Sequence, residues 1–278
     1  MNTSEPPQIL WRAFFCLSIT LLCLSAWPLT TSAKEKPIVL SIGFSDGDPP
    51  TSWANDSVTA RGLLPELAAA VFKRINDIHI DAHPYPWPRV KLMAEKGELD
   101  SMFTYPSDSR KAFMLFSDEP AYVIDYGYII FHRENPKAEQ LATISDYTQL
   151  ANFLMVTEGP ETDDSWEEEN LALDTFPRIY VNKAVQMFHL LFRRQSADYF
   201  IRNLEEARYI ANTLGYGDKF AYTKVNFATQ NVIPFHLGVH KSHPFAEYII
   251  EQINKVQSTP EFKKEAREII ERYQHLEM

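Results

Sequence analysis

Cysteine is nearly absent from this chain: of its 278 residues, only Cys16 and Cys23 are cysteine. Both lie in an apolar N-terminal segment, and no cysteine follows them. The rest of the chain therefore has no disulfide, no thiolate metal site and no cysteine nucleophile. Any binding or chemistry there must use charged, polar and aromatic side chains.

Basic runs and further long apolar runs are absent as well. The formal net charge is −10, and the one basic and one acidic residue of the N-terminal segment, Arg12 and Glu5, cancel each other. An acidic chain without a basic run is a poor binder of nucleic acid, so we expect no such partner. After Ala33 no apolar stretch is long enough to span a bilayer.

Recognisable catalytic motifs are also missing. The sequence has no serine elbow, no HExxH zinc motif and no glycine-rich phosphate loop. Composition alone leaves Ser–His–Asp chemistry open, but no local pattern indicates it. We therefore expect a protein that is not an enzyme and that uses no cofactor.

The N-terminal segment has the pattern of a secretory signal peptide. Arg12 precedes the apolar run Ala13–Leu29, and Thr31–Ala33 offers the small residues that signal peptidase requires. A Trp-Pro pair interrupts the run, which is short for a membrane anchor, and neither cysteine has the surroundings of a lipoprotein cleavage site. We predict a signal peptide over 1–33, cleavage after Ala33 and a soluble periplasmic protein.

Strand and helix patterns alternate along the rest of the chain, which predicts an α/β fold. We expect two similar halves: 34–126 as the first part of lobe 1, 127–231 as lobe 2, and 232–278 as the return to lobe 1. The expected strands are Ile38–Phe44, His79–Pro84, Leu99–Thr104, Tyr126–His132, Phe153–Thr157, Ile179–Val181, Asp198–Ile201 and Leu237–His240. The expected helices include Gly62–Ile75, Pro88–Lys96, Ala184–Arg193, Glu205–Leu214 and two that close the chain, the last beginning at Ser258–Glu261.

The run Gly97–Tyr122 is the most informative part of the sequence. It reads as a buried strand, a polar turn and a helix start at Ser107–Ser109, with Arg110 in the first turn. A cation there opposes the positive end of the helix dipole. It is favoured if an anion lies between the guanidinium and the free backbone N–H groups. The alternative is that Arg110 is solvated or paired with Asp108 or Asp118, since surface ion pairs are common.

The same run resembles family 3 of the periplasmic solute-binding proteins, in which a "G-x-x-D-A" strand leads to "T-P-E-R-K" and then "F-S-D-P-Y". Other segments resemble the family's "D-x-x-x-P-F" loop and its "G-F-D-x-D-L", "I-x-D-L", "V-x-x-G" and "G-D-P-E-L" elements, in that order. The matching positions are Gly97, Asp100, Thr104, Ser107, Arg110, Lys111, Phe116–Asp118, Pro120 and Tyr122, with Phe44–Pro50, Gly62–Leu67, Ile144–Tyr147, Val156–Gly159 and His243–Phe245. The resemblance implies a two-lobed, type II periplasmic-binding fold whose crossings between lobes lie near Asp125–Gly127 and Asn231–Phe235.

In that family the arginine holds the α-carboxylate of the ligand, and the resemblance implies this role for Arg110. Loops of both lobes would line a cleft that closes around the ligand by a hinge motion. The turn before Arg110 is short, so either Thr104 or Tyr105 would face the ligand. The candidate ligand-binding residues are Arg110, Thr104, Tyr105, Asp48, Trp53 and Trp87 from lobe 1, and Gly159, Thr162 and Asn203 from lobe 2.

Some candidate positions differ from those of the family's amino-acid binders. Asn203 stands where they place an aspartate for the ligand's α-ammonium, and an amide carries no charge. Asp48 stands where they often have an aromatic residue, and it could supply the missing charge. Trp87, with Arg89, could form a wall of the cleft or pack under the next helix. A carboxylate site is therefore better supported than an amino-acid site.

One pattern resembles a metal site. His79, Asp81 and His83 alternate on one face of an expected strand, where they could hold a metal ion. A solvated strand face explains the same pattern, and nothing supplies the second shell that fixes metal ligands. We predict no metal site.

The expected function is capture of a small carboxylate-bearing ligand, an amino acid or a relative, for an ABC importer by hinge closure. The partners would be that ligand and a membrane permease or receptor, with the protein a monomer. One alternative is cyclohexadienyl dehydratase chemistry, which the same fold supports, with Glu161 or Asp48 as general acid. Another is a ligand-sensing module for a membrane receptor.

Overall fold

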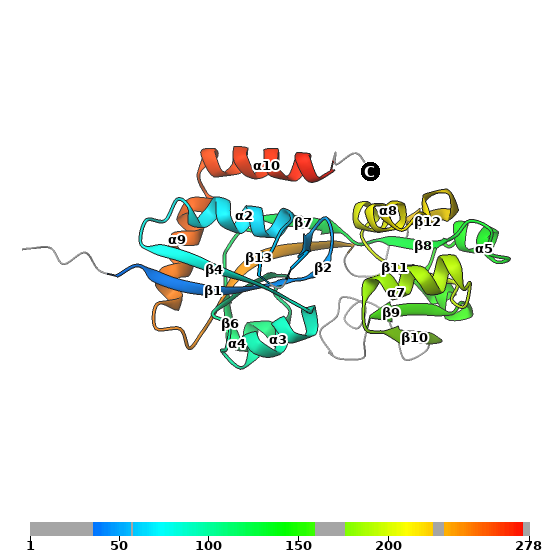
Figure 1. The fold of residues 1–278 in the computed structure, drawn as a ribbon, viewed down its shortest axis with the longest axis horizontal. Coiled ribbons are helices and arrows are strands. Elements are labelled where there is room, and N and C mark those ends of the chain that lie inside the picture. Colours follow the sequence, from blue (N-terminus) through cyan, green and yellow to red (C-terminus); the bar gives the residue numbers. More distant parts are fainter. Residues whose placement is uncertain (1–35, 57, 159–175, 225–230, 275–278) are drawn as a thin grey trace, which may run out of the picture. The chain divides into compact units, whose positions relative to one another are not determined.

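The computed structural model describes residues 36–56, 58–158, 176–224 and 231–274. These residues contain two large β-sheets, each flanked by helices (Figure 1). The predicted α/β fold class is therefore confirmed. The predicted signal peptide, 1–33, lies outside the described residues.

The first sheet has the strand order β4-β1-β5-β13-β6, and β7 also pairs with β13. β1 is parallel to β4 and β5, whereas β13 is antiparallel to β5, β6 and β7. Because β13 comes from late in the chain and lies between β5 and β6, the chain returns to its first sheet. The strands are β1 (Ile38–Ser45), β4 (Ile78–Tyr85), β5 (Ser101–Thr104), β6 (Met114–Phe116), β7 (Tyr122–Asp125) and β13 (Val232–His240).

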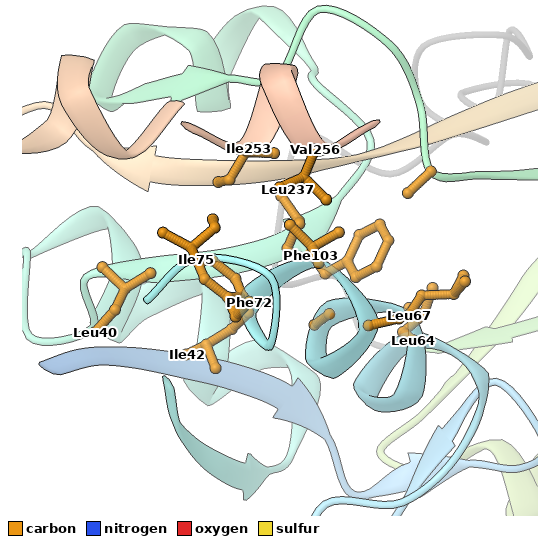
Figure 2. Packing of buried hydrophobic residues seen from close by; sticks show 14 of the residues in the cluster. Leu40, Ile42, Leu64, Leu67, Phe72, Ile75, Phe103, Leu237, Ile253 and Val256 are labelled. Carbon is orange, nitrogen blue, oxygen red and sulfur yellow. The ribbon is translucent and has the colours of Figure 1, made fainter. Parts of the chain in front are cut away.

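Helices cover both faces of the first sheet. The largest core cluster lies between the sheet and α2 (Leu63–Phe72), α9 (Ala246–Gln257) and α10 (Pro260–Gln274). The helix α3 (Trp87–Glu95) packs on the opposite face. Figure 2 shows the cluster, with labelled side chains Leu40, Ile42, Leu64, Leu67, Phe72, Ile75, Phe103, Leu237, Ile253 and Val256. Full burial of each such side chain contributes about 1.5–3 kcal/mol, so this core fixes the sheet against its helices.

The second sheet has the strand order β10-β9-β11-β8-β12. The strands are β8 (Tyr128–His132), β9 (Met155–Glu158), β10 (Arg178–Val181), β11 (Tyr199–Ile201) and β12 (Phe220–Lys224). One core cluster packs it against α7 (Ala184–Phe188), the π-helical turn η3 (His189–Arg193) and α8 (Leu204–Thr213). A second cluster, on the other face, includes residues of α5 (Ala138–Ala142) and η1 (Tyr147–Asn152).

The structure corrects the expected elements in a few places. Strands β6, β7 and β12 were not expected from the sequence, because each is short and is stabilised by pairing with β13 or β8 rather than by its own pattern. The helix expected over Ala184–Arg193 changes from α-helical to π-helical at His189. Most other expected elements are present, with ends that differ by a few residues.

The segments that join the two sheets run side by side. β7 pairs with the start of β13, with Asp125 opposite Val232, and the backbone N–H of Tyr126 donates to the carbonyl of Asn231 at 2.7 Å. β8 begins just after this point, at Tyr128. Two antiparallel strand segments thus connect the sheets.

The loop after β1 is anchored to the first turn of α2. This loop includes the short strands β2 (Gly47–Asp48) and β3 (Ser52–Trp53). The backbone N–H groups of Leu63 and Leu64 donate to the carbonyls of Pro50 and Thr51, at 3.1 and 3.0 Å. Gly62 makes this approach possible: its φ is +117°, and a Cβ there would lie 2.7 Å from the Thr51 carbonyl oxygen.

Gly62→Ala should therefore destabilise the fold, because alanine meets both the unfavourable φ and the Thr51 carbonyl. We expect a loss of about 1–3 kcal/mol in the free energy of unfolding, measured by urea denaturation. Gly47→Ala is the matched control in the same loop, because a Cβ there has nothing within 4 Å. Equal effects of the two substitutions would contradict this account of the loop.

Candidate functional site

The candidate residues lie mostly where parallel strands end. β1 and β5 are parallel neighbours, so Ser45 and Thr104, the last residues of these strands, lie at the same end of the first sheet. β9 and β11 are parallel neighbours in the second sheet and end at Glu158 and Ile201. Ligand sites of α/β sheets lie beyond such carboxyl ends.

Arg110 is buried near the carboxyl end of β5, with 5% of the residue exposed. It belongs to the short helix α4 (Asp108–Phe113), and its backbone N–H donates to Ser107 Oγ, the helix N-cap, at 3.3 Å. Its Nη1 donates to Thr104 Oγ1 and to the Tyr105 carbonyl oxygen, both at 3.0 Å. The side chain is thus held by the end of β5 rather than extended into solvent.

Two aromatic rings flank the same guanidinium. The Arg110 Cζ lies 5.6 Å from the ring centroid of Trp87 and 5.6 Å from that of Tyr105, distances at which a cation is attracted to a ring face. Trp87 begins α3 and packs on the core cluster under that helix. Its expected packing is therefore observed, and its role as a wall of the ligand cleft stays a prediction. The structure brings Arg110, Thr104, Tyr105 and Trp87 together.

The expected alternative partners of Arg110 are engaged with other groups. Asp108 pairs with Lys111 at 3.2 Å, and Asp118 accepts a hydrogen bond from Asn254 Nδ2 at 2.8 Å. Because α4 has only 6 residues, the dipole at its N-terminus is small.

One residue of the family-like run supports the site without forming part of it. Asp100 Oδ2 accepts from the backbone N–H and the hydroxyl of Ser41, at 2.9 and 2.6 Å. The backbone N–H of Asp100 donates back to Ser41 Oγ at 3.0 Å. These bonds join β1 to the start of β5 and so hold in place the strand whose other end contacts Arg110.

A second charged cluster lies around Arg202, which directly follows β11. Its Nη2 is 2.6 Å from Asp48 Oδ1 and 2.7 Å from Glu206 Oε1, and its Nη1 is 3.5 Å from Glu158 Oε2. The Arg202 side chain is 7% exposed and that of Glu206 is 8% exposed. Asp48 is oriented by Ser45, whose hydroxyl donates to Asp48 Oδ2 at 2.6 Å. One buried guanidinium therefore faces three carboxylates.

Burial and charge act against each other in this cluster. Burial alone lowers the pKa of Arg202, but Glu206, Asp48 and Glu158 raise it well above its usual value, so Arg202 stays charged. Burial raises the pKa of Glu206 to about 7; Asp48 and Glu158 add to the rise, and Arg202 opposes it. At neutral pH Glu206 is therefore partly protonated.

Asn203 and Trp53 lie in different surroundings from Arg110. Asn203 Oδ1 accepts from the backbone N–H of Glu206 at 3.0 Å as the N-cap of α8, and its Nδ2 donates to the Asp125 carbonyl at 3.3 Å. Trp53 packs edge-on against Tyr273 at 6.5 Å and lines a separate surface pocket of about 400 Å³. Their roles in ligand binding stay predictions.

Three further positions lie outside the described residues: Gly159, Glu161 and Thr162. The described part of the chain contains no group of three or more His, Cys, Asp or Glu side chains that could hold a metal ion. Of the three residues considered for a metal, His83 Nε2 lies 3.1 Å from Asp81 Oδ2. In the same part of the chain, no helix is both long enough and apolar enough to cross a membrane.

The sequence reasoning missed Arg202 and Glu206. A signal for them was present: Arg202 follows the apolar strand Tyr199–Ile201 directly, and Glu206 lies four positions later, where a helix brings the two side chains together. Their partner Asp48 could not be found in this way, because it is 154 residues away in sequence.

Solved structures with a type II periplasmic binding fold align with most of this chain. A substrate-binding protein of an amino acid ABC transporter aligns with a TM-score of 0.66 at 15% identity, over 84% of this chain and 98% of its own. A histidine kinase sensor domain aligns with a TM-score of 0.69 at 13% identity, over 86% and 97%. A substrate-binding protein from Streptococcus pneumoniae bound to L-arginine aligns with a TM-score of 0.66 at 16% identity, over 85% and 94%.

At such low identities, the TM-scores show that these proteins share the fold of this chain and show nothing more. The sequence profile of the bacterial extracellular solute-binding proteins, family 3, matches residues 40–274, and the chain belongs to this family. The resemblance inferred from the sequence is therefore confirmed. The family is one of extracellular solute-binding proteins, and the similar structures include a substrate-binding protein and a sensor domain. A comparison with curated protein sequences finds no match.

The raised pKa of Glu206 implies that the free energy of unfolding depends on pH. Between its unfolded-state pKa of 4.5 and about 7, the folded protein holds the proton more tightly than the unfolded chain does. The contribution of Glu206 to stability is therefore lost as the pH rises through this range. Glu206→Gln should become progressively more stable relative to the parent protein from pH 5 to about 8.

Urea denaturation at several pH values measures this difference. Glu205→Gln is the matched control on the same helix, because Glu205 is exposed, and its difference from the parent protein should stay nearly constant. A difference between Glu206→Gln and the parent that does not change with pH would disprove the assignment.

Proposed function

We propose that the protein is a periplasmic solute-binding protein that captures a small carboxylate-bearing ligand, an amino acid or a relative, and delivers it to an ABC importer. It would be exported by the signal peptide 1–33, cut after Ala33, and would act as a monomer. Membership of the solute-binding family supports this proposal. The similar structures include a substrate-binding protein of an amino acid ABC transporter.

The observation that carries the proposal is the arrangement around Arg110. Arg110, which is 5% exposed, donates to the Thr104 hydroxyl, and its guanidinium lies 5.6 Å from the ring centroids of Trp87 and Tyr105. A carboxylate placed there would receive a planar, charged donor in a low-dielectric environment, where such a pair is strong. The rings would contact the apolar part of the same ligand.

The proposed mechanism is closure of two lobes about the paired connections. Lobe 1 would comprise 34–126 and 232–278, and lobe 2 would comprise 127–231. The connections at Tyr126 and Asn231 can bend without breaking either sheet, because they lie between the sheets. Closure follows ligand binding when the ligand's contacts are stronger in the closed form than in the open form.

Two alternative functions, ligand sensing for a membrane receptor and dehydratase chemistry, use the same fold. The likeness to a histidine kinase sensor domain is compatible with delivery of the liganded form to a membrane receptor instead of a permease. Dehydratase chemistry would need a protonated acid. Asp48, one of the two candidates for that acid, already pairs with Arg202 at 2.6 Å.

Arg110→Ala should strongly weaken binding of the carboxylate ligand. The loss of a desolvated charged partner costs about 2–5 kcal/mol, which is roughly 30-fold to several-thousand-fold in Kd. A thermal-shift screen of residues 34–278 against amino acids, dicarboxylates, polyamines and prephenate-like acids would identify the ligand class. Titration of the best ligand against both proteins then measures the loss.

Lys111→Ala is the matched control, because Lys111 is the next residue and its ammonium pairs with exposed Asp108. It should bind the ligand as the parent protein does. Unchanged affinity in Arg110→Ala would disprove the role of Arg110. Selective stabilisation by polyamines would replace it with a cation site, and conversion of a prephenate-like acid would favour the enzyme alternative.

A further inference from the structure

The cluster around Arg202 contains a cation supplied by the protein itself. Its three carboxylates come from the loop after β1 (Asp48), the end of β9 (Glu158) and the first turns of α8 (Glu206). The guanidinium contacts all of them, at 2.6 to 3.5 Å. Arg202 thus links a loop of the first sheet to two elements of the second.

The cluster lies at the strand ends where the proposed function places the ligand. Asp48 lies three residues beyond the end of β1, whose parallel neighbour β5 ends at Thr104, the residue that holds Arg110. Asp48 and Glu158 are partly exposed, at 26% and 42% of their side chains. Without Arg202, these carboxylates would offer a binding site to the cationic group of a ligand, such as a guanidinium or an ammonium.

A ligand cation must compete with Arg202 for these carboxylates. Arg202 is part of the chain and already oriented. It therefore contacts the carboxylates without the loss of translational and rotational entropy that a free ligand would suffer. Its charge also repels an incoming cation at short range. The partial protonation of Glu206 further reduces the negative charge that a ligand could use.

We propose that Arg202 is a specificity-determining residue: it occupies the acidic pocket formed by Asp48, Glu158 and Glu206 and excludes ligands with a cationic side chain. The ligand is then an acid whose side chain is uncharged or acidic, unlike the L-arginine bound to the similar protein from Streptococcus pneumoniae. This choice of ligand class rests on the proposed function, whereas occupation of the pocket by Arg202 does not.

A purely structural ion pair is the competing explanation, and loss of stability in Arg202→Ala is expected from both. Chemical rescue separates them. If Arg202 fills a cation pocket, its removal leaves a space that free guanidinium can enter, at millimolar concentrations far below those that denature proteins. The thermal midpoint Tm of Arg202→Ala should then rise by roughly 2–4 °C in a saturable way, relative to equal concentrations of sodium chloride.

Arg208→Ala is the matched control on the same helix. Arg208 donates an exposed hydrogen bond to the Tyr222 hydroxyl at 3.0 Å, lies over the Tyr222 ring and forms no part of the cluster. Neither this variant nor the parent protein should gain Tm from guanidinium. Should Arg202→Ala fail to fold, Arg202→Ala/Glu206→Gln removes the buried unpaired charge and is titrated in the same way. Absence of a selective rise in the folded variant would overturn the proposal.

A second titration tests the ligand class. L-arginine and L-lysine should leave the Tm of the parent protein unchanged and should stabilise Arg202→Ala. Stabilisation of the parent protein by either amino acid would overturn the proposed specificity but leave the solute-binding function intact. Rescue by guanidinium together with a lack of any ligand for the parent protein would give the opposite result: the pocket assignment would stand and the proposed function would fail.

Discussion

The buried guanidinium of Arg202 needs its carboxylate partners, and this constraint links the loop after β1 to the start of α8. Leaving one charge of such a pair unpaired in the interior costs about 3–5 kcal/mol. Asp48 is held on one side by the Ser45 hydroxyl and on the other by Arg202, and Glu206 is held by Arg202 across one helical turn. Arg202 therefore links the loop after β1, which is also bonded to α2, to the start of α8, which Asn203 also caps.

The two charged groups, Arg110 and Arg202, are supported in contrasting ways. Arg110 has hydroxyl, carbonyl and aromatic neighbours, which orient its guanidinium. Arg202 has three acidic neighbours that balance its charge.

Much of the fold could be predicted from the sequence because its elements have strong local patterns. β1 and α2 follow the expected apolar spacing, and Ser107 caps α4 as its position before Arg110 suggested. Elements that depend on distant partners could not be predicted. The strand β12 is defined by its pairing with β8, and nothing in its own residues gives an apolar alternation as clear as that of the core strands.

The candidate site shows the same division between local and distant contacts. Thr104, Tyr105 and Arg110 lie within one short stretch of sequence, so a sequence motif could identify them together. The pairing of Asp48 with Arg202 joins residues 154 positions apart, and only the folded chain shows that Asp48 already has a basic partner. The sequence therefore suggested a free charge at Asp48, whereas the structure shows an engaged one.

The position of β13 has a consequence for how the chain folds. This strand lies between β5 and β6 and yet is made after all strands of the second sheet. Until it arrives, β5 has an open edge, and the first sheet cannot be completed during synthesis. The second sheet has all its strands earlier and can form first. A chain whose first sheet closes last remains incompletely folded until nearly all of it has been made.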